Sequence, residues 1–149
     1  MKNLLVTLLL SFMLLGCGPK YMQHEATRPP PTIGWIEGKN AAEAIATAME
    51  RPLFSYYPNE KCTETDKKTL SDTEVVILVQ DNFVPFKGEP VEEGEPRFEI
   101  KTTNGIMIAG PAGCPGVSDM VRYIYMSKLL AALFNGADLE ELLEGLGGE

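Results

Sequence analysis

Several residue types on which catalysis and nucleic-acid recognition depend are scarce in this chain. Its 149 residues include one histidine, His24, and no basic run longer than Lys67-Lys68, and the formal net charge is −8. Because a polyanion repels a protein of this sign unless a basic face is segregated, nucleic acid is disfavoured as a partner. A Ser–His or Cys–His pair would have to recruit His24 from a proline-rich linker, so we do not expect a nucleophilic enzyme.

Motifs for cofactors and metals are missing as well. The glycine-rich stretch at 110–116 has neither a Gly-Lys-Ser/Thr ending nor dinucleotide-binding spacing, and the acids at 89–95 do not follow the alternating pattern of a calcium loop. We therefore expect no cofactor and no metal site. The 21 acidic residues guarantee that some carboxylates come close together, so a carboxylate-dependent hydrolase stays a hypothesis that composition does not decide.

The first 18 residues have the organisation of a secretory signal. Lys2 is followed by a short apolar run at 4–15, the run ends in Leu14-Leu15-Gly16-Cys17, and no acid interrupts it. The run is too short to span a hydrocarbon layer of about 30 Å as a helix. This segment resembles the lipobox signal peptide of bacterial lipoproteins, whereas we identify no family for the rest of the chain.

The resemblance implies that Cys17 carries lipid. In that family the chain is cleaved before the cysteine, which bears a diacylglyceryl thioether and usually an acylated amine. Two or three acyl chains anchor a protein firmly without a transmembrane helix. Gly18 follows the cysteine in place of an aspartate, which in Gram-negative bacteria implies the outer membrane and its periplasmic side. In a host with one membrane, the resemblance implies the extracellular face of that membrane.

The remaining chain divides into a tether and one domain. We predict a signal peptide at 1–16, a lipidated tether at 17–34 and a single periplasmic domain at 35–149. Pro29-Pro30-Pro31 favour an extended polyproline II segment, which would hold the domain away from the bilayer.

Two cysteines remain once Cys17 is assigned to lipid, namely Cys62 and Cys114. In an oxidising compartment an even pair of this kind predicts a disulfide, and closing a loop of this length is worth roughly 4 kcal/mol in the chain-entropy model. A reactive thiol at Cys114, just before a helix, is the alternative. We favour the structural disulfide because Cys-x-x-Cys spacing is absent.

The domain is predicted to be α+β, with a small antiparallel or mixed sheet of about three strands, two to three packed helices and one disulfide. A helix is expected at 41–51, with Ala41, Ala44, Ile45, Ala48 and Met49 on its buried face. The apolar run at 74–79 is expected to be a central strand covered on both faces. Residues 53–72 and 81–96 are expected to be irregular.

A hairpin gives the clearest local signal in the domain. Strands at 97–103 and 106–110 flank Asn104-Gly105, which predicts a two-residue type I′ turn, with Thr102 opposite Met107 and Ile100 opposite Ala109. In this register the second strand is covered on both faces and lies beside 74–79, and the first strand is nearer the edge.

Two helices are predicted at the C-terminal end. Ser118 is expected to cap a helix at 119–134, with Val121, Ile124, Tyr125, Leu129, Ala132 and Leu133 on its core face. Residues 129–134 are apolar all round, so another segment should cover the far side. A short helix beginning at Asp138 carries a stripe formed by Leu139, Leu142, Leu143 and Leu146, which either folds back on this neighbour or docks on a partner.

Among functions, protein binding is favoured. The leucine stripe and the acidic loop, with Glu89, Glu92, Glu93 and Glu95, are the candidate contact surfaces. We expect an accessory lipoprotein of an outer-membrane assembly or secretion system. A lipoprotein that binds a small ligand or a cell-wall component is the alternative, and it would require a pocket with polar lining groups.

Overall fold

A four-stranded mixed sheet forms the centre of the domain in the computed structural model, which describes residues 32–93, 95, 97–138 and 140. The strand order is β2-β1-β3-β4; β1 pairs parallel with β2 and antiparallel with β3, and β4 is antiparallel to β3. The strands are β1 (Leu53–Tyr56), β2 (Val84–Lys87), β3 (Phe98–Lys101) and β4 (Met107–Ala109). The predicted α+β class is confirmed, with one strand more than expected.

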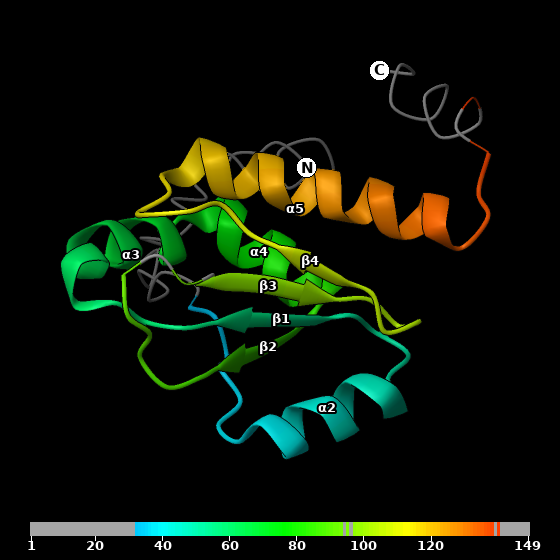
Figure 1. Cartoon of the computed structure of the whole chain (residues 1–149), viewed down its shortest axis with the longest axis horizontal. Helices are drawn as coiled ribbons and strands as arrows, with labels where there is room; N and C mark the ends of the chain where they lie inside the picture. Colours follow the sequence, from blue (N-terminus) through cyan, green and yellow to red (C-terminus); the bar gives the residue numbers. More distant parts are fainter. Residues whose placement is uncertain (1–31, 94, 96, 139, 141–149) are drawn as a thin grey trace, which may run out of the picture.

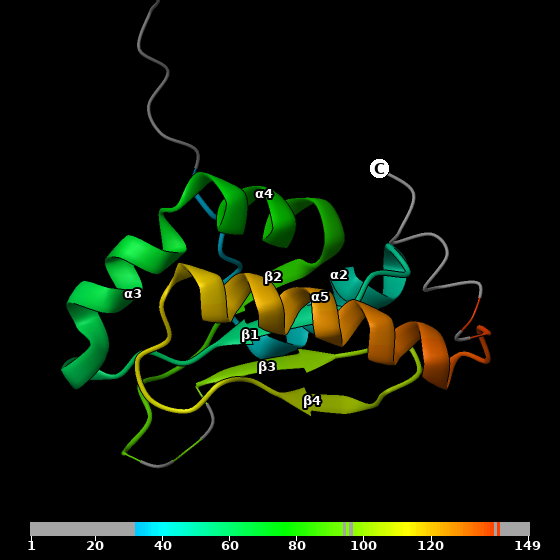
Figure 2. The same ribbon diagram turned by 90° about the horizontal axis from the view of Figure 1, so that it is seen from above.

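Helices cover the two faces of the sheet unequally. On one face lie α4 (Thr73–Asn82) and α5 (Val117–Phe134), with α3 (Thr63–Leu70) at their end, and on the other lies α2 (Lys39–Ala48) (Figures 1 and 2). A 3-10 turn, η1 (Glu60–Cys62), precedes α3. No helix among the described residues is long and apolar enough to cross a membrane.

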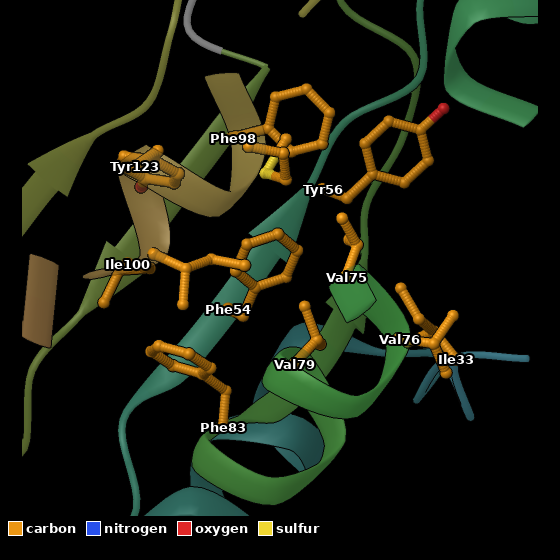
Figure 3. Close-up of a cluster of buried hydrophobic side chains, with 12 residues drawn as sticks. Ile33, Phe54, Tyr56, Val75, Val76, Val79, Phe83, Phe98, Ile100 and Tyr123 are labelled. Carbon is orange, nitrogen blue, oxygen red and sulfur yellow. The ribbon is translucent and has the colours of Figure 1, made fainter. Parts of the chain in front are cut away.

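The larger hydrophobic core lies between the sheet and α4 and α5. Phe54 is fully buried at its centre, and Val75 and Val79 of α4 face it across the interface (Figure 3). Phe98 and Ile100 of β3 extend this layer toward α5, which contributes Met120 and Ile124. The smaller core beneath α2 consists of Ala42, Ala46, Leu53, Val84 and Phe86.

The predicted strand at 74–79 is wrong, because these residues belong to α4. Asp72 caps this helix: its side chain accepts hydrogen bonds from the backbone N–H groups of Glu74 and Val75 at 3.0 and 3.3 Å. Val75, Val76 and Val79 are buried on one face while Ile77 is 48% exposed, whereas a strand covered on both faces would bury Ile77. β-branching lowers helix propensity only slightly, so the cap and the one-sided core outweigh it.

Two of the four strands, β1 and β2, lie in segments that we expected to be irregular. Both are only four residues long, and β1 is buried on both sides, so only β2 shows the alternation of a half-exposed strand, over too few residues to form a clear pattern. Pro85 within β2 argued against a strand. Proline is tolerated here because β2 is at the edge of the named strands, where the Pro85 carbonyl accepts a hydrogen bond from Ile36 N–H at 2.9 Å.

The hairpin is present, but its predicted register is wrong by one residue. Ile100 lies opposite Ile108 and Lys101 opposite Met107, because the loop has three residues, Thr103 to Gly105, with Gly105 at φ 86°. A left-handed glycine at the end of such a loop makes a bulge, and a one-residue slip moves every side chain to the other face. Ile108 therefore faces the core, Met107 is 52% exposed, and β4 rather than β3 is the edge strand.

The predicted helices α2 and α5 are confirmed, but each buries a different face from the one predicted. In α2 the buried residues are Ala42 and Ala46, while Ile45 is 38% and Met49 52% exposed. In α5 they are Met120, Tyr123, Ile124 and Ser127, so the predicted contact at Tyr125 is wrong. The cap of α5 is Gly116 rather than Ser118, and Asp119 accepts a hydrogen bond from Gly116 N–H at 3.3 Å.

The predicted C-terminal leucine stripe lies beyond the limit of the described residues. Asp138 accepts a hydrogen bond from Glu140 N–H at 2.8 Å, as the cap of a helix does. Leu139, Leu142, Leu143 and Leu146 lie outside the described residues. Within α5, Phe134 is 57% exposed, whereas residues 129–133 are half-buried.

Candidate binding site at the disulfide end of the sheet

The disulfide between Cys62 and Cys114 is present, as the cysteine count predicts. It joins the end of η1, directly before α3, to the connector between β4 and α5, with the two Cα atoms 5.2 Å apart. Cys62 is buried and Cys114 is exposed. The bond therefore fastens a surface segment to the interior at one end of the sheet.

The connector at 110–116 is held by hydrogen bonds as well as by the disulfide. Arg97 Nη1 donates to the Gly113 carbonyl at 2.9 Å, and the Thr69 hydroxyl donates to the Pro115 carbonyl at 2.9 Å. At its start the chain passes so close to β3 that a Cβ on Gly110 would lie 2.6 Å from Phe98 Cβ. Glycine is therefore required where the connector leaves the sheet.

A buried ion pair lies directly behind the connector. Asp66 of α3 pairs with Arg97, which precedes β3, and both side chains are at most 6% exposed. Asp66 Oδ2 also accepts a hydrogen bond from the Tyr56 hydroxyl at 2.5 Å. Burial, and then this bond to a carboxylate, raise the pKa of Tyr56 well above its usual range, so the phenol stays protonated. The guanidinium lies against the rings of Tyr56 and Phe98, with centroid distances of 5.9 and 5.4 Å.

No pattern in the sequence indicated this network. Asp66 and Arg97 are 31 positions apart, and each is surrounded by other charged residues in the sequence. Single charged residues in polar segments are normally exposed, so nothing local distinguishes these two from their neighbours. Only the approach of α3 to the start of β3 brings them together.

The acidic loop that follows β2 lies against the chain that follows β1. Asn59 Nδ2 donates to the Val91 carbonyl at 3.0 Å, and Val91 N–H donates to the Pro58 carbonyl at 3.0 Å. Glu93 forms an ion pair with Lys61. Glu89, Glu92, Glu93 and Glu95, the predicted contact residues, are all exposed. The loop is thus anchored in the middle while its carboxylates face solvent.

The disulfide and the acidic loop, which the sequence indicated as separate features, both line one hollow of about 270 Å³. We call it the acidic hollow; its lining includes Cys62, Cys114, Arg97, Glu92, Glu93 and Glu95. It lies beyond the carboxyl ends of the parallel strands β1 and β2, which is where open sheets commonly place binding sites. Glu89 does not line it. Arg97 is neutralised by Asp66 and Lys61 by Glu93, so Glu92 and Glu95 give the rim a negative charge.

The other predicted site residues, Cys17 and the leucine stripe, lie outside the described residues. Within the described chain, no group of three or more His, Cys, Asp or Glu side chains is arranged to hold a metal ion.

Comparisons with known proteins show a relation in fold. No protein-family model matches the chain, and no curated protein matches it. Among solved structures, the solution structure of a thioredoxin from Thermus thermophilus is similar, with a TM-score of 0.57 and 18% identity over 70% of this chain and 93% of that chain. At this identity the likeness shows the fold alone, because one fold hosts many functions.

Proposed function

We propose that this chain is a membrane-anchored envelope lipoprotein whose domain binds another protein, as a non-catalytic accessory of an outer-membrane assembly or secretion system. The observation that carries the proposal is the acidic hollow, where a rigid, disulfide-fastened wall lies opposite exposed carboxylates. A preorganised concave surface with one sign of charge suits a basic segment of a partner. The lipobox resemblance at residues 1–18 supports the membrane anchor.

The charge of the rim favours fast association more than tight binding. Exposed carboxylates attract a basic partner over a distance of about one Debye length, roughly 8 Å at physiological salt. Because Glu92 and Glu95 form no ion pair with another described residue, their charge is not offset locally. Binding at this site should therefore weaken as salt rises.

Charge reversal tests the acidic hollow. In the variant Glu92→Lys with Glu95→Lys, capture of the partner from envelope extracts should fall at least about fivefold at low salt and much less at high salt. The matched control is Glu50→Lys with Asp81→Lys, which changes the net charge equally at exposed positions near the other ends of β1 and β2. An unchanged partner set in the first variant at both salt concentrations would remove the proposal for this surface.

Lipidation is tested at Cys17. The variant Cys17→Ser should accumulate as a full-length precursor that takes up no labelled palmitate, because the thiol is the acceptor of the first lipid. Metabolic labelling and N-terminal analysis of the wild-type protein should show an acylated mature chain that begins at Cys17. Wild-type protein without label, and with a different N-terminus, would contradict the predicted localisation.

A small-ligand-binding lipoprotein is the second candidate function, because a separate hollow with aromatic walls lies on the other side of Asp66. We do not propose a carboxylate-dependent hydrolase. Asp66, the buried acid of the described chain, is bound by Arg97, and the acids at the rim of the acidic hollow are exposed.

A further inference from the structure

A second hollow, of about 470 Å³, lies where the N-terminal part of the domain passes the end of β1. We call it the aromatic hollow. Its lining comes from four parts of the chain and includes Trp35, Tyr56, Pro58, Lys67, Leu70 and Lys87. Its volume is within the range of about 300–1,000 Å³ that small-molecule sites occupy. Asn59 lines both this hollow and the acidic hollow.

The walls of the aromatic hollow are apolar, aromatic and supported from behind. The ring centroids of Trp35 and Tyr56 are 5.4 Å apart, and Trp35 also stacks on the fully buried Phe54 with a centroid distance of 6.2 Å. Trp35 and Leu70 themselves are only partly buried. The core thus fixes the position of the indole while part of its surface remains available, as in a preformed site for a flat apolar group.

Charge distinguishes this hollow from its acidic neighbour. Asp66 lies in its lining, but Arg97 offsets that carboxylate. Of the remaining lining groups, Lys67 and Lys87 are positive and Glu60 is negative, and all three are exposed. Among the described residues, Lys67 pairs only with Glu64, in an exposed contact of the kind that a ligand displaces at little cost. Lys87 has no ion-pair partner among the described residues.

We propose that the aromatic hollow binds a small amphipathic anion, with an apolar ring or chain against Trp35 and Leu70 and an acidic group toward Lys67 and Lys87. The volume, the apolar walls and the positive mouth together favour this class over a cation or a fully polar molecule. The inference deepens the second candidate function. It does not depend on the acidic hollow, whose carboxylates are on the other side of the Asp66–Arg97 pair.

Two related dyes provide probes, and the single tryptophan of the chain, Trp35, provides the readout. 8-Anilinonaphthalene-1-sulfonate is an aromatic anion, and N-phenyl-1-naphthylamine has the same aromatic ring system without the sulfonate group. Both dyes should quench Trp35 emission by energy transfer when they bind in the aromatic hollow. Absence of energy transfer from Trp35 to the bound anionic dye would overturn the proposal, because it would place the dye elsewhere.

The role of the two lysines is tested by comparing the affinities of two variants for the two dyes. Lys67→Gln with Lys87→Gln should weaken binding of the anionic dye about fivefold and leave the neutral dye unchanged, as loss of two exposed charge contacts implies. The control, Lys39→Gln with Lys128→Gln, removes the same charge at exposed positions outside the lining and should change neither dye by more than about twofold. Equal effects of the two variants on the anionic dye would overturn the proposal. The lysine variant retains Glu92 and Glu95, so partner capture tests the acidic hollow separately.

Discussion

Arg97→Met is expected to lower the free energy of unfolding by about 3–5 kcal/mol, as is typical when one partner of a buried ion pair is removed. The Asp66 carboxylate would remain almost fully buried with only the Tyr56 hydroxyl as a partner. The connector would also lose the hydrogen bond from Arg97 to the Gly113 carbonyl. Urea unfolding at neutral pH, followed by far-UV circular dichroism, measures the difference.

A variant that removes the whole network provides the control. Tyr56→Phe, Asp66→Leu and Arg97→Met together leave no buried charge, and replacing a buried ion pair by apolar side chains is often close to neutral. The triple variant should therefore be more stable than Arg97→Met alone. If Arg97→Met lowered the free energy of unfolding by less than about 1 kcal/mol, the result would contradict the burial of this ion pair, because exposed ion pairs contribute no more than that.

Removing the disulfide is the second change with a large expected effect. Cys62→Ala with Cys114→Ala should reduce the free energy of unfolding by roughly 4 kcal/mol, since the two cysteines are 52 positions apart and the cross-link restricts a long loop in the unfolded chain. The bonds from Arg97 to Gly113 and from Thr69 to Pro115 remain. We therefore expect the native fold to persist with a lower unfolding midpoint in urea.

The same variant separates a structural bond from a reactive one. Under reducing conditions, the unfolding midpoint of the wild-type protein should match that of the double variant. Both proteins should retain partner capture at permissive temperature. A redox or thiol mechanism predicts the reverse: little loss of stability and a complete loss of function. Non-reducing peptide mapping of protein secreted to an oxidising compartment should recover Cys62 joined to Cys114, and two free thiols would refute the pairing.

Sequence patterns predicted those features of the fold that depend on local chemistry or on counting. The disulfide followed from the two cysteines left after Cys17, and Asn104-Gly105 indicated a hairpin at the correct place. The same glycine did not determine the register, because a two-residue loop and a three-residue loop with a bulge use it equally well. The loop has three residues rather than two, and this difference determines which face of β4 packs against the core.

The errors share a physical cause, which is that short apolar runs take their conformation from their surroundings. Val75, Val76 and Val79 fit one face of a helix as well as they fit a buried strand, and only the Asp72 cap distinguishes the two. The candidate site depends on contacts between segments that are further apart in the sequence. Cys114 and Glu92 line the same hollow, and Asp66 pairs with Arg97, because the strand order brings their segments together. No spacing pattern in the sequence indicates either of these contacts.

Site-specific photo-crosslinking in intact cells tests the central claim, that the acidic hollow is where a partner binds. A photoreactive amino acid at position 92 should give an adduct with an envelope protein through a basic segment, identifiable by mass spectrometry and lost when Glu95→Lys is added. The same group at position 50, which is exposed and precedes β1 at the other end of the sheet, should not give that adduct. Identical adducts from the two positions, or none from position 92 in cells that contain the protein, would contradict the account.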